Sequence, residues 1–392
     1  MMRLAVISEC SPFDRKGQFN AVHNRIRHLK AEGGCEVDAF CIHSWDTAFT
    51  RKVRHTPYVP EKQQNVIVDD ITYHMLWYDF SIIDHITVEK LHRKPVIFGR
   101  FISRALPLFE GYDAVIAHSF TGALFAEAVK SRYGIPYFVT WHGSDIHTHP
   151  WRNPLILETT RRLMQEASYN FFVSRTLMAE SGKITSDVEK DVLYNGVSED
   201  FVRFSDIERT ELRNRYGLGD DKVVAFVGNL SAVKNVDMLQ PIFHEVRSRF
   251  GKPLKFLVVG DGKMHQKVEQ MFAGDVSIDV RMMGNRPAQE MPSIMNCIDV
   301  LVLPSRNEGL PLVCLEAMKC GAAVAGADVG GVAEVIGKEN VVPHGPGFLV
   351  EIASKVVCML ESDARQVCPD DLDWKKTAAR EMDHLRKLII FA

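Results

Sequence analysis

The chain has 392 residues, of which 46% are hydrophobic and 25% are charged. This length exceeds that of one ordinary domain, and the composition is that of a globular protein, which excludes a disordered or fibrous chain. The formal net charge of −3 gives no overall attraction to nucleic acid, so we expect no nucleic-acid partner. The eight cysteines form no C-x-x-C pair and several lie in apolar runs, which predicts a cytoplasmic location.

Short apolar, β-branched runs alternate with helical patterns from the first residues onward, and MMRLAVISEC begins as a strand rather than as a signal peptide. Near-continuous apolar strands between helices are typical of parallel sheets covered on both faces. The expected strands are 3–8, 37–42, 73–78, 113–119, 137–142, 169–174 and 191–196, then 222–228, 254–260, 280–284, 299–305 and 322–326. A polar, charge-rich segment at 198–221 separates the two series and predicts a hinge between two doubly wound α/β domains. Ligands of such sheets bind at the loops that follow the strands.

The segment 90–109 is basic and amphipathic. It carries five lysines or arginines and no acidic residue, and its apolar side chains fall on one helical face while Arg100 and Arg104 fall on the other. A helix of this kind can lie in a membrane interface. It can also pack on its own domain, and both hypotheses stay open. No apolar run reaches the roughly 18 residues needed to span a bilayer.

The stretch YFVTWHGSD (137–145) places a histidine at the end of a strand. Gly143 then permits a tight turn, and Asp145 is a candidate cap of the next segment. His142 is thereby exposed to ligands, and its chemistry suits hydrogen bonding or proton transfer. The spacing of His142, His147 and His149 matches no familiar ligand pattern, so we expect no metal ion.

The stretch FVGNLSAVKN (226–235) follows the first strand of the second series. Asn235 is the expected N-cap of a helix that starts at Val236. Lys234 would then lie near unpaired N–H groups and the positive end of a helix dipole, a favourable place for an anion. Lys234 is a candidate partner of a diphosphate, and the alternative of an ordinary surface lysine stays open.

The stretch SRNEGLPLVCLEAM (305–318) predicts a short apolar helix with Pro311 at its first position. Glu316 lies inside this apolar run, where a buried carboxylate is costly without donors. A ribose diol would supply two hydroxyl donors, and the alternative is an Arg or Lys partner across the core. Glu308, in the loop before the helix, can accept hydrogen bonds from sugar hydroxyls.

Together these stretches resemble the retaining glycosyltransferases of family 4, which have the GT-B fold. The blocks that carry the resemblance are WHGSD (141–145), YNGV (194–197), FVGNLSAVKN (226–235), VVGDG (258–262), GGVAEVIG (330–337) and the E-x7-E pair Glu308 and Glu316. The resemblance covers nearly the full length. It implies two Rossmann-like domains facing across a cleft: an acceptor-binding domain at 1–197 and a nucleotide-sugar-binding domain at 198–374. A C-terminal helix at about 375–392 would pack back on the first domain.

The resemblance also implies residue roles. Lys234 would neutralise the diphosphate, Glu316 would hold the ribose, and Glu308 would hold the donor sugar. The further residues implied at the donor site are Gly17, Asn229, Gly262, Asn285, Arg286, Gly309, Leu310, Pro311 and Leu312. The implied catalytic residues are His142, Lys234 and Glu308, with His118 and Asp145 on the acceptor side. No metal ion or other cofactor is implied.

Asn229 departs from the family pattern, because this position usually carries an arginine that gives the diphosphate a second cation. The first loop also has one glycine, Gly17, rather than a pair. We therefore expect weaker or differently arranged diphosphate binding, with Arg306 as a candidate replacement.

The sequence thus predicts a retaining, metal-independent transferase that moves a sugar from a nucleoside-diphosphate sugar, with a UDP-sugar as first choice, to a hydroxyl of a glycan or lipid-linked acceptor. Polysaccharide or cell-envelope biosynthesis at the cytoplasmic face of the membrane is the expected setting. A GT-B epimerase or phosphorylase is one alternative. A non-catalytic sugar-nucleotide-binding subunit, marked by Asn229, is another, because fold alone does not decide function.

Overall fold

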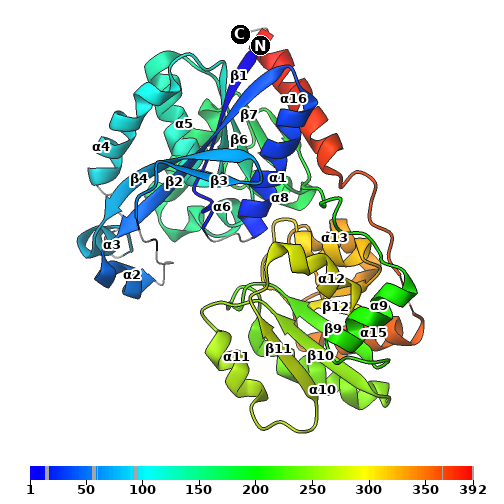
Figure 1. The fold of residues 1–392 in the computed structure, drawn as a ribbon. Helices are drawn as coiled ribbons and strands as arrows, with labels where there is room; N and C mark the ends of the chain where they lie inside the picture. The colour runs from blue at the N-terminus through cyan, green and yellow to red at the C-terminus, as the bar shows by residue number, and fades with distance from the viewer. Residues whose placement is uncertain are drawn as a thin grey trace. The chain divides into compact units, whose positions relative to one another are not determined.

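The computed structural model describes residues 1–13, 17–54, 59, 61–89, 91, 96–363 and 365–390. The chain divides into two compact units, Met1–Asn195 with Trp374–Ala392, and Gly196–Asp373 (Figure 1). The sequence analysis places the corresponding junctions at 197/198 and 374/375. Each unit is described by itself.

The first unit is built on an eight-stranded sheet. Its strands are β1 (Met2–Ser8), β2 (Cys35–Asp46), β3 (Asn65–Val68), β4 (Ile71–Phe80), β5 (Ala114–His118), β6 (Tyr137–Trp141), β7 (Tyr169–Phe172) and β8 (Lys190–Val192). They lie in the order β3-β4-β2-β1-β5-β6-β7-β8. The β3–β4 pair is antiparallel, and the other pairs described are parallel.

Helices cover both faces of this sheet. They are α1 (Gly17–Glu32), α2 (Ala48–Arg54), α3 (Ile82–Glu89), α4 (Val96–Ala105), α5 (Ser119–Tyr133), α6 (Ser144–His147), α7 (Pro154–Glu166), α8 (Arg175–Ser181) and the C-terminal α16 (Trp374–Ile390). Helix α16 lies beside α1 (Figure 1). Ala378, Met382 and Leu385, spaced by four and three residues, put one face of α16 into the core shared with β1 and β2.

The basic segment packs its apolar side on its own unit. Phe98 and Phe101 of α4 lie with ring centroids 5.5 Å and 5.4 Å from that of Tyr78 on β4. Phe101 and Ala105 are buried, whereas Arg100 and Arg104 are exposed. The structure therefore supports the packing hypothesis for 98–109. Residues 90 and 92–95 lie outside the described residues. Among the described residues, we find no helix long and apolar enough to cross a membrane.

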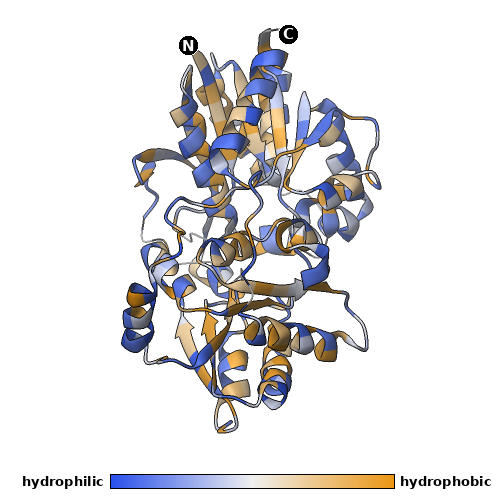
Figure 2. Ribbon diagram, turned by 90° about the vertical axis from the view of Figure 1, so that its right-hand side faces the viewer, coloured by the Kyte–Doolittle hydropathy of each residue, from blue (hydrophilic) through white to orange (hydrophobic). Residues whose placement is uncertain are grey.

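The second unit is built on a six-stranded parallel sheet in the order β11-β10-β9-β12-β13-β14. Its strands are β9 (Lys222–Val227), β10 (Leu254–Val259), β11 (Asp279–Gly284), β12 (Val300–Leu303), β13 (Ala323–Ala327) and β14 (Val341–Val342). Its helices are α9 (Asp206–Arg215), α10 (Leu239–Phe250), α11 (His265–Phe272), α12 (Met291–Asn296), α13 (Leu312–Lys319), α14 (Val332–Ile336) and α15 (Phe348–Glu361). The strands are predominantly hydrophobic in Figure 2, as two-sided burial requires.

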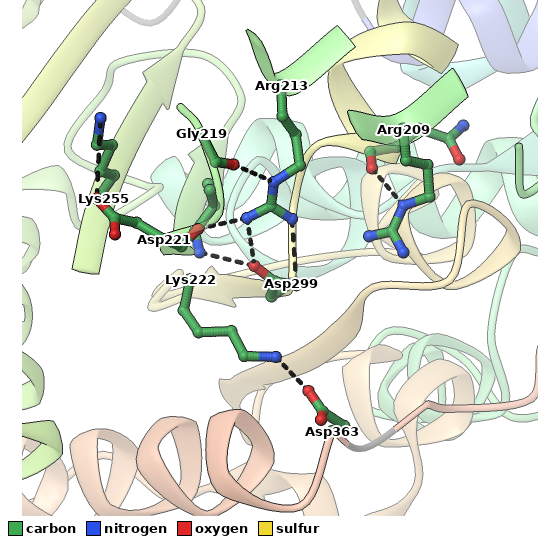
Figure 3. Close-up of polar contacts among 10 residues, drawn as sticks. Arg209, Arg213, Gly219, Asp221, Lys222, Lys255, Asp299 and Asp363 are labelled. Atoms are coloured by element: carbon green, nitrogen blue, oxygen red, sulfur yellow. Dashed lines mark hydrogen bonds and ion pairs between the residues drawn. The ribbon is translucent and has the colours of Figure 1, made fainter. Parts of the chain in front are cut away.

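The charged segment 198–221 begins two residues after the junction of the two units at Asn195/Gly196. It contains α9, which starts at a complete capping box between Ser205 and Glu208. Arg213 of α9 holds both carboxylate oxygens of Asp299, at 3.4 Å and 3.1 Å, and Asp299 also accepts from the Val223 backbone at the start of β9 (Figure 3). Most of the segment belongs to the second unit, where Arg209 of α9 also donates to the Asn296 carbonyl oxygen at 2.8 Å.

Candidate functional site

The loops at the carboxyl ends of the second unit's strands are joined to one another through their backbones. The loop after β9 meets the loop after β10, since Leu230 N donates to Asp261 O at 3.0 Å. It also meets the loop after β12, since Arg306 N donates to Val233 O at 2.8 Å. The loops after β12 and β13 meet where Gly331 N donates to Gly309 O at 3.0 Å. This edge is where ligands of open α/β sheets bind.

Two glycines allow these loops to approach so closely. A Cβ on Gly330, whose φ is +51°, would lie 1.7 Å from the carbonyl oxygen of Glu308. A Cβ on Gly262 would lie 2.3 Å from Oδ1 of Asn229 and 2.4 Å from the carbonyl oxygen of Leu230. Both distances are far below van der Waals contact, so only glycine fits. The backbone of Gly262 thus lies directly against Asn229 and Leu230 in the loop after β9.

Lys234 and Glu308 lie together, although 74 residues separate them in sequence. Lys234 Nζ donates to Glu308 Oε1 at 2.6 Å, and the glutamate is buried while the lysine is half-buried. The two opposite charges compensate each other in the ligand-free protein. The structure thus brings together two residues that sequence reasoning placed at the donor phosphate and donor sugar.

Asn235 occupies the N-cap position that the sequence predicts, but its side chain does not cap the helix. It precedes a short 3-10 helix, Val236–Met238, but its φ of +53° is left-handed and its side chain makes no capping bond. Its amide instead joins its own loop to the loop after β12. Nδ2 donates to Pro304 O at 3.1 Å, and Oδ1 accepts from Arg306 Nε at 3.1 Å. Asn235 therefore holds the exposed Arg306, and Asn235 itself follows Lys234 directly in the sequence.

Glu316 lies on α13, which starts at Leu312, so Pro311 precedes the helix rather than occupying its first position. The Glu316 side chain is half-buried, and no hydrogen bond or ion pair is found for it among the described residues. Burial raises the pKa of its carboxyl to about 7. The alternative of an Arg or Lys partner for Glu316 is thus not seen in the described part of the chain.

The other residues implied at the donor site occupy varied surroundings. Asn229 is exposed, and Leu310 is buried between Gly309 and Pro311. Asn285 and Arg286 follow β11, where Arg286 lies 3.7 Å from Glu290 in a half-exposed ion pair. Gly17 is exposed at the start of α1, in the first unit.

The first unit holds a second cluster, at the carboxyl ends of the adjacent parallel strands β5 and β6. His118 is the last residue of β5, and His142 follows β6 directly. His118 Nδ1 and His142 Nε2 lie 2.9 Å apart and share a hydrogen bond. The sequence placed both residues near the transfer reaction without predicting their contact.

Asp145 organises this cluster rather than capping its own helix. Its Oδ2 accepts from His142 N at 3.2 Å, and its Oδ1 accepts from Phe120 N at 3.3 Å at the start of α5. The Ser119 hydroxyl also donates to it, and these bonds offset part of the rise in the carboxyl's pKa that burial causes. Asp145 therefore ties the turn after β6 to the turn after β5.

Both histidines are held neutral. Burial lowers the pKa of His118 well below its usual value, and His142 and the Arg25 guanidinium lower it further. Burial and then Arg25 lower the pKa of His142 to about 3. Neither imidazole carries a charge at neutral pH, so His142 cannot serve there as a cation.

Sequence reasoning missed several residues of this cluster. Ser119 has a left-handed φ of +66° in the turn that joins β5 directly to α5, and its hydroxyl accepts from Gln18 Nε2 at 2.5 Å. No glycine marks this turn, so the sequence carries no signal for it. Arg25 does carry a signal, since it falls on the apolar face of α1 between Val22 and Leu29.

The described residues contain no group of three or more His, Cys, Asp or Glu side chains arranged to hold a metal ion. Cys314 and Cys320, which lie near Glu316, are not activated as nucleophiles, because burial raises the pKa of both thiols.

Two family models match the chain, one for each unit. Residues 17–196 match the glycosyl transferase 4-like domain, and residues 221–362 match the glycosyl transferases group 1. The 2-deoxystreptamine glucosyltransferase of Streptomyces kanamyceticus is 31% identical over 62% of this chain and 66% of its own length. The putative teichuronic acid biosynthesis glycosyltransferase of Bacillus subtilis is 30% identical over 58% of this chain and 56% of its own length. The chain thus spans about two thirds and just over half of these relatives.

Solved structures share the fold over the whole chain. The sucrose-phosphate synthase of Thermosynechococcus elongatus has a TM-score of 0.77 at 17% identity and covers 100% of both chains. Anabaena HepE in complex with UDP-glucose has a TM-score of 0.68 at 16% identity, covering 100% of this chain and 98% of that one. These likenesses establish the GT-B fold. The chain therefore belongs to the family 4-like glycosyltransferases, which have the GT-B fold.

Proposed function

We propose that this protein is a retaining glycosyltransferase that moves a sugar from a UDP-sugar to a hydroxyl of a glycan or lipid-linked acceptor, without a metal ion. Polysaccharide or cell-envelope biosynthesis at the cytoplasmic face of the membrane is the proposed setting. The observation that carries the proposal is the Lys234–Glu308 pair on the loops after β9 and β12, together with Glu316 on α13, whose side chain has no partner among the described residues. The UDP-glucose held by HepE and the teichuronic acid relative support the donor and the setting.

The second unit is the proposed donor-binding unit. Glu316 gains in a ribose diol the two hydroxyl donors that it lacks among the described residues. Lys234 gives the diphosphate a charge-assisted hydrogen bond, and Glu308 accepts from hydroxyls of the sugar. Gly309, Leu310 and Leu312 offer backbone N–H groups at the start of α13, and Arg306 adds a nearby cation.

Breaking the sugar–phosphate bond places negative charge on the departing diphosphate. Lys234 stabilises that charge as it develops, which is the electrostatic contribution that dominates many rates. Retention often uses a carboxylate nucleophile. Asp145 is unsuited to this role because its oxygens are engaged by His142 N, Phe120 N and the Ser119 hydroxyl. We therefore favour a front-face path in which the leaving phosphate takes the acceptor's proton.

The first unit is the proposed acceptor-binding unit, with His118, His142 and Asp145 at the carboxyl ends of β5 and β6. The second candidate function is a non-catalytic sugar-nucleotide-binding subunit. It is favoured by Asn229, which leaves the loop after β9 with Lys234 as its cation.

A panel of UDP-, GDP- and ADP-sugars distinguishes these functions. We expect UDP-sugars to raise the melting temperature, by an amount that corresponds to about 2.7 kcal/mol at 100 times the Kd. Slow release of UDP from the donor and faster release with a suitable glycan acceptor would support the enzyme. Stabilisation with no release across a broad acceptor panel would favour the binding subunit, and no stabilisation by any nucleotide sugar would contradict both.

A further inference from the structure

The His118–His142 contact has a specific consequence for the protons of the two rings. A hydrogen bond between His118 Nδ1 and His142 Nε2, 2.9 Å apart, needs one donor and one acceptor. One ring therefore gives its proton to the bond, and the position of the second proton on each neutral ring follows from that choice.

In the first arrangement, Nε2–H of His142 donates to Nδ1 of His118. Neutral His118 must then carry its own proton on Nε2. That atom is buried in a residue that is 1% exposed, and it has no partner. The arrangement thus leaves an N–H group without an acceptor, which is the rarer and costlier kind of buried orphan.

In the second arrangement, Nδ1–H of His118 donates to Nε2 of His142. His118 Nε2 is then a lone pair, and the nearby Arg25 guanidinium on α1 favours an electron pair over a proton. Burial lowers the pKa of Arg25, and Glu381 on α16, whose Oε2 lies 3.4 Å from Arg25 Nε, offsets part of that fall. Asp145, the third charged group of the cluster, holds the His142 and Phe120 backbones.

We propose that His118 is a positioning residue that donates from Nδ1 to Nε2 of His142 and thereby fixes the proton of His142 on Nδ1. His142 Nδ1 has no partner among the described residues, so its N–H group is available to a ligand. His142 then works as a neutral hydrogen-bond donor to a substrate oxygen and not as a base. This last step rests on the proposed function, whereas the proton positions do not.

The surrounding backbone keeps His118 in place for this task. Strand β5 runs into α5 without a connecting loop, through Ser119 at a φ of +66°. Ser119 is fixed by its bonds to Gln18 and Asp145. Strain of this kind persists where the surrounding structure holds it, and it is common at functional sites.

Nitrogen-15 NMR of the ligand-free protein, labelled at histidine, tests the proposal directly. Long-range ¹H–¹⁵N correlations should show His142 protonated at Nδ1 and bare at Nε2, and His118 likewise. This is the opposite of the tautomer that free imidazole side chains prefer. Protonation of His142 at Nε2 would overturn the proposal.

Two variants extend the test to activity. His118→Asn keeps an amide N–H near the place of Nδ1, whereas His118→Leu removes the donor. We expect His118→Leu to shift His142 to the Nε2–H tautomer and to lower kcat about tenfold, the effect of one neutral hydrogen bond, with His118→Asn restoring most of it. A folded His118→Leu variant with an unchanged His142 tautomer and full kcat would overturn the proposal. If wild-type protein shows the expected tautomer but transfers no sugar, the inference stands and the proposed function fails.

Discussion

Glu316→Gln should separate the cost of this carboxylate in the folded protein from its value in ligand binding. Burial raises the folded-state pKa of Glu316 to about 7, above its unfolded value of 4.5. A raised carboxyl pKa means that the folded state favours the neutral form. The stability that Glu316 contributes is therefore fully present below about pH 4.5 and is lost as the pH rises to about 7.

The size of the effect follows from that shift. At about 1.36 kcal/mol for each pKa unit, the rise from 4.5 to about 7 corresponds to at most about 3–4 kcal/mol. Partial exposure of the side chain reduces this figure. Glutamine has nearly the shape of the neutral acid and does not ionise. Above pH 7 we thus expect the ligand-free Glu316→Gln protein to be more stable than wild type.

Differential scanning calorimetry from pH 5 to pH 8 measures this difference. For a unit of this size, each kcal/mol corresponds to about 2–4 °C in Tm. We expect the Tm advantage of Glu316→Gln to grow by several degrees between pH 5 and pH 8, and we expect UDP-sugars to stabilise the variant less than wild type. Glu361→Gln, at the exposed end of α15, is the matched control and should show no such trend. A pH-independent difference between Glu316→Gln and wild type would refute the reasoning.

Three further substitutions test other parts of the structure. Glu381→Ala should destabilise the first unit by about 3–5 kcal/mol, because it leaves the buried Arg25, whose Nε lies 3.4 Å from Glu381 Oε2, without its opposite charge. Urea denaturation followed by tryptophan fluorescence measures this loss of stability. An equal or larger loss of stability in the double variant Arg25→Met/Glu381→Leu would contradict the prediction. Lys234→Ala should weaken UDP-sugar binding roughly 10- to 100-fold in calorimetry, as loss of a charged hydrogen bond does, whereas Lys252→Ala, an exposed lysine, should not. Gly330→Ala should lower Tm more than Gly274→Ala, since both have positive φ but only the first Cβ would meet backbone, at 1.7 Å; equal losses would argue against the close loop contact.

The strands of both sheets could be predicted from the sequence because their apolar runs are nearly continuous. The short edge strands β3 and β14 could not, since an edge strand needs only half the apolar pattern of a buried one. Helix α9 was not predicted because its composition is charged and Leu212 is its buried residue. The S-x-x-E spacing of Ser205 and Glu208 was the available signal for that helix.

The candidate site was predictable where a residue is anomalous in its own surroundings. Glu316 inside an apolar helix and His142 at a strand end are of this kind. Contacts between loops were not predictable in the same way. The Lys234–Glu308 bond and the His118–His142 bond depend on which strands are neighbours and on their register, and Asn235 left its expected capping role for a contact with Pro304.

A crystal structure of the protein with bound UDP tests the central claim most directly. The account predicts ribose hydroxyls within hydrogen-bonding distance of both Glu316 carboxylate oxygens, and the diphosphate against Lys234 and the backbone of Gly309–Leu312. It also predicts that Lys234 Nζ turns from Glu308 toward the diphosphate. UDP bound elsewhere on the second unit, with Glu316 untouched and the Lys234–Glu308 bond intact at 2.6 Å, would contradict the account.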